Sequence, residues 1–183
     1  MTRTKLFTQG ILPVNTMELP KLVFTDIDGV WTDGGMYYDQ TGNEWKKFNT
    51  SDSWGVAFCK AFGIEVVIIT GEDTEIVKRR AAKLKIQNCF LGVKDKLLLA
   101  EDILAKRGLT FKDAAFIGDD FNDIGLLRKV GLPGCPNNAP EYIKSLVQFK
   151  GKKNGGEGAF REFVEYILCM QYTMDEIVSR VAH

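Results

Sequence analysis

Short apolar runs alternate with amphipathic segments along most of this 183-residue chain, and this alternation strongly limits the fold. Each run is followed by polar or glycine residues, as buried strands are. The predicted strands span 22–25, 64–69, 88–91, 114–117, 131–136 and 146–149. The predicted helices span 52–62, 73–85, 95–107, 121–130, 140–145 and 160–168. Strands and helices that alternate in this way form a mostly parallel sheet covered by helices on both faces. The sequence therefore predicts an α/β, Rossmann-like fold.

The domain organisation follows from length and composition. With 183 residues, 45% of them apolar, the chain is expected to form one domain with a sizeable core. Residues 1–20 are predicted to be a loosely ordered extension without the apolar core of a signal peptide. The domain is predicted at 21–170, followed by a helical tail at 171–183. Two aromatic segments, at 36–38 and 44–48, flank Gly42 and predict a β-hairpin.

Several residue types are scarce, and this narrows the chemistry. The only histidine is His183, so histidine-based triads and histidine zinc sites are not expected. The four cysteines form no C-x-x-C pair, which favours reduced thiols in a cytoplasmic protein over a disulfide framework. A formal net charge of zero gives no case for nucleic acid as a partner, and no apolar stretch is long enough to span a membrane.

Polar residues gather where four predicted elements begin or end. Asp26 and Asp28 follow the first strand, Thr70 follows the second, Lys96 begins a helix, and Asp119 follows the strand at 114–117. The carboxyl ends of parallel strands share one edge of the sheet, so these groups are expected to lie together. Carboxylates beside a lysine suit Mg²⁺ and a phosphoryl group. For Asp26 and Asp28 alone, an ordinary acidic turn is the competing interpretation.

The ordered series D-x-D-G-V, T-G, Lys96 and G-D-D-x-N-D resembles the motifs of the haloacid dehalogenase (HAD) superfamily of phosphatases, over residues 22–168. The resemblance implies that Asp26 attacks phosphorus and that Asp28 acts as general acid and then general base. It also implies that Thr70 and Lys96 hold the phosphoryl group. By the same resemblance, Mg²⁺ binds Asp26, the backbone carbonyl of Asp28, and Asp119. Gly71 and Asn122, within these motifs, are candidates for substrate contact.

The spacing of the motifs leaves no room for a cap domain, because only a hairpin lies between Asp28 and the helix at 52–62. In this respect the chain resembles the capless, tetrameric sugar-acid phosphatases, in which the hairpin and a neighbouring subunit cover the site. A homotetramer with sites at subunit interfaces is therefore expected. A bare sheet edge excludes water poorly, which agrees with that expectation. The segment 155–158 resembles a loop that crosses between subunits, although a flexible turn is the alternative.

The substrate prediction depends on departures from the octulosonate 8-phosphate phosphatases. Their arginine-containing segment is here Asn49, Thr50, Ser51 and Asp52, and the residue after T-G is Glu72. Glu72 with Lys83 resembles the nonulosonate (KDN or N-acetylneuraminate) 9-phosphate phosphatases, and the two could share one helix face. Arg80 and Lys83 are candidates to bind the sugar carboxylate. An ordinary solvated helix face is the alternative for Glu72 and Lys83.

The sequence thus predicts a phosphatase acting on a nonulosonic acid 9-phosphate in sialic-acid-type biosynthesis. The first alternative is a 3-deoxy-D-manno-octulosonate 8-phosphate phosphatase. A second, from another class, is an oligomerisation module that resembles HAD domains but lacks catalysis. Intact Asp26, Asp28, Lys96 and Asp119 argue against that module.

Overall fold

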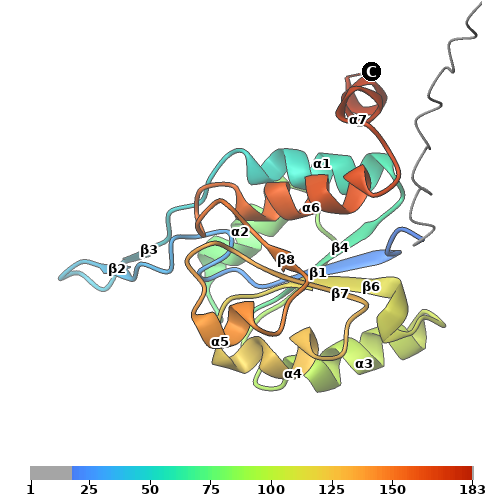
Figure 1. Ribbon diagram of the computed structural model, residues 1–183. Coiled ribbons are helices and arrows are strands. Elements are labelled where there is room, and N and C mark those ends of the chain that lie inside the picture. The colour runs from blue at the N-terminus through green and yellow to red at the C-terminus, as the bar shows by residue number, and fades with distance from the viewer. Residues whose placement is uncertain (1–17, 183) are drawn as a thin grey trace, which may run out of the picture.

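The computed structural model describes residues 18–182, which are built around one six-stranded sheet (Figure 1). Across the sheet the order is β5 (Asn88–Phe90), β4 (Glu65–Ile69), β1 (Leu22–Thr25), β6 (Ala114–Ile117), β7 (Leu132–Cys135) and β8 (Phe149–Lys150). Every neighbouring pair is parallel. The predicted α/β fold with a mostly parallel sheet is therefore confirmed.

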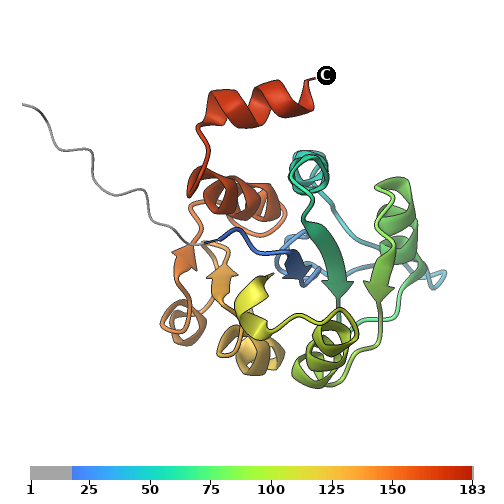
Figure 2. The same cartoon turned by 90° about the vertical axis from the view of Figure 1, so that its right-hand side faces the viewer.

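Strand β1 lies inside the sheet, and its side chains contribute to the two core layers on opposite faces of the sheet. Side chains alternate along a strand, so Leu22 and Phe24 join one buried cluster while Val23 joins the other. The Val23 side is covered by α1 (Asp52–Ala61), α2 (Glu75–Lys83) and α6 (Ala159–Cys169). The other side is covered by α3 (Lys96–Lys106), α4 (Ile124–Leu127) and α5 (Glu141–Lys144). Figures 1 and 2 show these layers above and below the sheet.

Helix α7 (Met174–Val181) lies outside the layer formed by α1 and α6 (Figure 1). Its start is capped reciprocally by Thr173 and Glu176, and its buried residue Ile177 reaches the core. Within residues 18–182 no helix is both long and apolar enough to cross a membrane. Residues 1–17 of the predicted extension, and His183, lie outside the described residues.

The hairpin consists of β2 (Tyr37–Tyr38) and β3 (Glu44–Trp45), and it projects away from the sheet (Figure 1). Its large apolar side chains are exposed, including Tyr38 and Trp45. In the described part of the chain, this hairpin is the only strand-containing insertion between β1 and α1. The site therefore has no cap domain in this segment.

Three predicted elements differ from the structure. The helix predicted at 121–130 is a 3-10 turn, η2 (Phe121–Asp123), followed by α4, because the Asp123 side chain turns back onto the preceding backbone. The last strand is Phe149–Lys150 rather than 146–149, since Leu146 still donates to the Ile143 carbonyl in a turn. Helix α2 begins at Glu75, after an extended Thr74, and not at 73. A second 3-10 turn, η1 (Phe111–Asp113), precedes β6.

Candidate active site

Asp26 stands directly after β1, and its backbone N–H still bonds to the Ile117 carbonyl of the neighbouring strand (3.0 Å). Its side chain is therefore aimed by the sheet itself. One carboxylate oxygen accepts a hydrogen bond from the Ile27 N–H (2.7 Å), and the other lies 2.7 Å from Lys96 Nζ. Asp26 is only 5% exposed, so this charge depends on its few polar neighbours.

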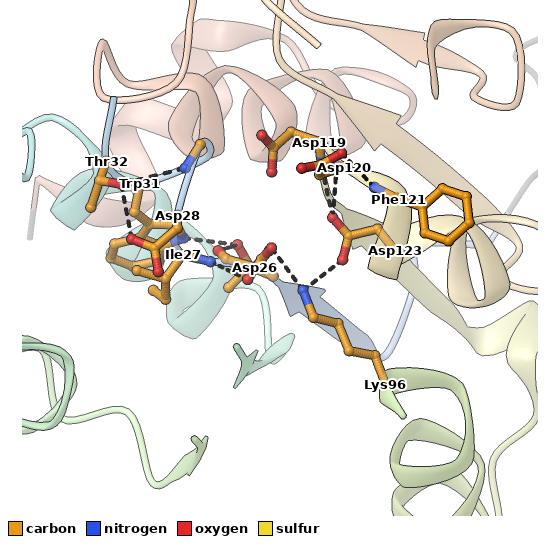
Figure 3. A network of polar contacts seen from close by, with 12 residues as sticks. Asp26, Ile27, Asp28, Trp31, Thr32, Lys96, Asp119, Asp120, Phe121 and Asp123 are labelled. Atoms are coloured by element: carbon orange, nitrogen blue, oxygen red, sulfur yellow. Dashed lines mark hydrogen bonds and ion pairs between the residues drawn. The ribbon is translucent and has the colours of Figure 1, made fainter. Parts of the chain in front are cut away.

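Lys96 is the first residue of α3, and its side chain is buried between two carboxylates (Figure 3). Its ammonium lies 2.7 Å from Asp26 Oδ2 and 2.6 Å from Asp123 Oδ1. The start of α3 is capped by Asp95, which accepts from the Leu98 N–H. Burial opposes the charge of Lys96, but the two carboxylates outweigh it and raise the pKa of this lysine. Lys96 is thus a fixed cation.

Asp123 holds both the lysine and the loop that carries Asp119. While Oδ1 bonds to Lys96, Oδ2 accepts hydrogen bonds from the backbone N–H groups of Asp119 (2.9 Å) and Asp120 (3.1 Å). Gly118 makes this possible, since a Cβ there would overlap the Asp123 carboxylate. Asp123 was not among the predicted site residues. The repeated acids in G-D-D-x-N-D were the available signal, but their spacing did not separate a ligand from a supporting residue.

Asp119 is crowded against the other acids. Single oxygens of Asp26, Asp119 and Asp123 all lie within 4.8 Å of one another. Burial, followed by the charges of Asp26 and Asp123, raises the pKa of Asp119 to about 8. Burial and Asp123 likewise raise the pKa of Asp26 to about 7, against the lowering effect of Lys96. At neutral pH such a cluster either keeps a proton or is fully ionised only beside a bound cation.

The three acids are not equal as metal ligands. Both oxygens of Asp123 are already used by Lys96 and the backbone, whereas the Asp119 carboxylate accepts no hydrogen bond from residues 18–182. Asp26 and Asp119 therefore fit a hard cation such as Mg²⁺, and Asp123 fits a supporting role.

Asp28 is held by residues that sequence reasoning did not select. Lys46, just after β3, lies 2.6 Å from Asp28 Oδ1, and the Thr32 hydroxyl donates to the same oxygen at 3.3 Å. The Lys46 side chain is only 1% exposed, while that of Asp28 is 27% exposed. The other oxygen, Oδ2, is buried without a hydrogen-bond partner. The predicted hairpin was the only signal near Lys46, and it did not show which side chain would point inward.

A cavity of about 440 Å³ brings most of the predicted catalytic groups together. Of the predicted site residues, its walls contain Asp26, Asp28, Thr70, Gly71, Glu72, Asp119 and Asn122. Lys96 lies behind Asp26 and reaches its carboxylate. The shared sheet edge thus places a nucleophile candidate, an acid–base candidate and a cation around one space.

The other predicted substrate contacts lie outside the walls of this cavity. Asp52 is fully buried and accepts from the Arg161 N–H at 3.1 Å, so it caps the start of α6. Arg80 donates to the Asn49 carbonyl (3.0 Å) and to the Ser53 hydroxyl (3.2 Å). Lys83 is exposed, as is Thr50, while Ser51 is half-buried.

The predicted shared helix face for Glu72 and Lys83 is wrong. Glu72 lies in the loop before α2, where its carbonyl accepts from the Gly92 N–H, and Lys83 ends that helix. Nine helical residues span about 13 Å. Glu72 is therefore at the cavity, and Lys83 stands at the far end of α2.

The glycine segment at 155–158 packs on the turn that follows Asp26 in its own chain. The Gly156 N–H donates to the Val30 carbonyl (3.1 Å), and the Gly156 carbonyl accepts from Asn49 Nδ2 (3.1 Å). Gly155 is also buried, and a Cβ there would overlap the Gly29 carbonyl. The segment is thus fixed on its own chain and is not a loose turn.

Comparison with known proteins agrees with this geometry. No family model matches the sequence. The 3-deoxy-D-manno-octulosonate 8-phosphate phosphatase KdsC of Haemophilus influenzae is 37% identical over 155 residues, which cover 85% of this chain and 86% of the relative. Its Escherichia coli K12 counterpart is 34% identical over 156 residues, covering 85% and 83%.

Solved structures agree as well. A probable YrbI family phosphatase from Pseudomonas syringae superposes with a TM-score of 0.87 at 37% identity, covering 93% of this chain and 97% of that one. A 3-deoxy-D-manno-octulosonate 8-phosphate phosphatase from Moraxella catarrhalis, in complex with magnesium, phosphate and KDO, gives 0.84 at 34% identity, covering 87% and 92%. The chain therefore belongs to the KdsC-like family of phosphatases within the HAD superfamily.

Proposed function

We propose that this phosphatase hydrolyses a sugar-acid phosphate through a covalent aspartyl-phosphate on Asp26. The observation that carries the proposal is the position of Asp26 at the wall of the cavity, paired with Lys96 and close to Asp28 and Asp119. The sheet and α3 hold this nucleophile and its cation before any substrate binds. Such preorganisation lowers the cost of building charge on a phosphoryl group.

The chain's own residues then have distinct tasks. Asp26 attacks phosphorus while Asp28 gives its proton to the departing sugar oxygen, and the bond from phosphorus to that oxygen breaks. Asp28 next takes a proton from water, which attacks the same phosphorus and releases inorganic phosphate from Asp26. Lys96 offsets the negative charge of Asp26 that would otherwise repel the phosphate. The Thr70 hydroxyl, at the wall of the cavity, is placed to donate to a phosphoryl oxygen.

Magnesium fits this site as cofactor, because the crowded carboxylates of Asp26 and Asp119 are hard oxygen ligands that need a cation. We propose that these two residues hold it, together with the Asp28 carbonyl. When bound, the ion neutralises phosphate charge and polarises the phosphorus centre. The Moraxella relative carries magnesium and phosphate together, which supports the same assignment here.

For the substrate, we propose 3-deoxy-D-manno-octulosonate 8-phosphate, since the curated relatives are named for it. The nonulosonate 9-phosphate predicted from sequence is not confirmed by these comparisons. It stays a second candidate because Glu72, a departure from the octulosonate enzymes, lies at the wall of the cavity. The separation of Lys83 from Glu72 weakens the pairing on which that prediction relied.

A substrate panel separates the candidates. We expect kcat/KM to be at least about tenfold higher for the octulosonate 8-phosphate than for KDN or N-acetylneuraminate 9-phosphate. The reverse preference would restore the nine-carbon assignment. In that case Glu72→Arg should move the ratio toward the eight-carbon substrate.

The covalent step is tested with Asp26→Asn. Phosphate release with Mg²⁺ should fall at least about a thousandfold, because an amide is a poor nucleophile. Asp33→Asn is the matched control, since Asp33 lies on the same loop but pairs with Lys47 outside the cavity. Equal release by wild type and Asp26→Asn would end the aspartyl-phosphate mechanism.

We also propose a homotetramer in the cytoplasm. The exposed apolar residues of the hairpin support assembly, since Met36, Tyr38 and Trp45 would be covered by a partner subunit. A monomeric mass by light scattering would contradict this. An oligomerisation module without catalysis is not supported, because the chain belongs to a phosphatase family and keeps its acids and lysine.

A further inference from the structure

We propose that Lys46 is a positioning residue that sets the Asp28 carboxylate for proton transfer. The inference rests on the proposed role of Asp28 as general acid and base. Lys46 is placed by the hairpin and not by the sheet, since it follows β3 directly. The hairpin would then take part in the reaction.

The burial of Lys46 is the first observation. Its side chain is 1% exposed although it belongs to a projecting hairpin, and its ammonium lies 2.6 Å from Asp28 Oδ1. Glu44 is farther, at 3.7 Å. Burying an ammonium is costly unless a close anion offsets the lost hydration. The neighbouring Lys47 is a usual surface lysine: its side chain is 64% exposed, and its ammonium lies 3.2 Å from Asp33 Oδ2.

The second observation is that Asp28 has two partners on one oxygen and none on the other. Lys46 and the Thr32 hydroxyl both bond to Oδ1, whereas Oδ2 is buried without a partner. Asp28 itself lies at the wall of the cavity. Two donors on Oδ1 therefore fix the rotation of the Asp28 carboxyl group at the wall of the cavity.

The two donors are linked through the backbone. Thr32 and Phe48 form an antiparallel bridge, so the segment that carries Lys46 is tied to the residue that supplies the second donor. Phe48 also packs against the core. The position of the hairpin and the rotation of Asp28 are therefore mechanically connected.

Lys46 is not at the wall of the cavity, unlike Asp28. A lysine that bound phosphate directly would be expected there. Its effect must then pass through Asp28, which predicts a change in kcat rather than in KM.

The experiment compares Lys46→Met with Lys47→Met, a matched loss of charge one residue away. Each variant is assayed with the octulosonate 8-phosphate, whose leaving alkoxide needs a proton, and with para-nitrophenyl phosphate, whose leaving group does not. We expect Lys46→Met to lower kcat on the sugar phosphate about a hundredfold, with KM changed less than about threefold. On the aryl phosphate it should give a rapid release of nitrophenol equal to the enzyme concentration, followed by slow turnover. Lys47→Met should match wild type.

A second variant separates positioning from folding. Lys46→Gln keeps a donor without the charge, so it should recover a good part of the sugar-phosphate rate if the hydrogen bond to Asp28 matters. Equal losses on both substrates without a burst, a rise in KM with kcat unchanged, or wild-type rates would each overturn the proposal. If wild type itself turned over neither substrate, or Asp26→Asn equalled it, the proposed function would fail instead.

Discussion

Gly29 has no side chain, and the Asp119 carboxylate occupies the space that one would take. Its φ of +79° also lies in the left-handed region, which favours glycine. One residue thus allows both the turn after Asp26 and the close approach of a carboxylate from a different strand end. The acid cluster depends on this glycine as much as on the acids.

Gly29→Ala should displace Asp119 and weaken the cation site. We expect the Mg²⁺ concentration for half-maximal activity to rise at least about tenfold, with a loss of about 1–2 kcal/mol in unfolding free energy from backbone strain. Gly42→Ala is the control, because φ is +88° there with nothing within 4 Å of the added Cβ. Gly42→Ala should show a similar loss of unfolding free energy from backbone strain, but its Mg²⁺ concentration for half-maximal activity should equal that of wild type. An unchanged requirement in Gly29→Ala would contradict this account.

At the scale of single residues, the sequence located the groups that strand ends position. Asp26, Thr70 and Asp119 follow parallel strands, and such ends share an edge whatever the details of packing. Lys46 and Asp123 were not assigned roles, for two reasons. Lys46 reaches the site through a hairpin whose tilt is not encoded locally, and Asp123 serves through a side chain that folds back on its own loop.

Among the elements, α6 begins without a side-chain cap of its own, since its N-cap is Gly158. Asp52, at the start of α1, supplies the acceptor for the Arg161 N–H instead. The two helices are therefore joined at their starts as well as along their apolar faces. A segment predicted to bind substrate carries this structural contact, because sequence spacing cannot show a cap supplied by a distant helix.

Burial raises the pKa of Asp52 to about 6, above its ordinary 3.8. The folded state thus holds this proton more tightly than the unfolded state does. The resulting stability is complete below about pH 4 and is lost as pH rises through 6. Asp52→Asn keeps an acceptor and removes the buried charge. At pH 7.5 it should therefore raise the free energy of unfolding by up to about 3 kcal/mol.

Urea unfolding at pH 4 and pH 7.5 checks this prediction. The difference between Asp52→Asn and wild type should nearly vanish at the lower pH. Asp102→Asn is the control, because Asp102 is an exposed acid paired with Lys106 on α3. If Asp52→Asn were instead less stable than wild type at pH 7.5, the prediction would be wrong. The hydrogen bond accepted by the ionised Asp52 would then stabilise the fold by more than the burial of its charge destabilises it.

Across the whole molecule, stability and metal binding should be linked through pH. Without a cation, the pKa values of Asp26 and Asp119 are raised to about 7 and about 8. Their stabilising contribution is then present below about pH 4 and lost as pH rises through these values. Mg²⁺ requires both groups ionised, so its binding releases protons at lower pH.

Mg²⁺ should therefore raise the melting temperature much more at pH 8.5 than at pH 6. Differential scanning calorimetry with and without saturating Mg²⁺ measures this shift. At a fixed, saturating Mg²⁺ concentration, each tenfold gain in Mg²⁺ affinity adds about 1.4 kcal/mol to the free energy of unfolding. Asp119→Asn should show little Mg²⁺ effect at either pH. An equal shift at both pH values in wild type would contradict the linkage.

The packing of the glycine segment 155–158 on the turn after Asp26 has a consequence for folding during synthesis on the ribosome. The first 150 residues contain every acid that lines the cavity and also Lys96, which pairs with Asp26. The turn after Asp26 nevertheless packs against Gly155 and Gly156, which leave the ribosome later. A nascent chain stopped before them would carry the whole catalytic set on an unsupported turn. We expect such a stalled chain to be inactive until the residues after 150 have been made.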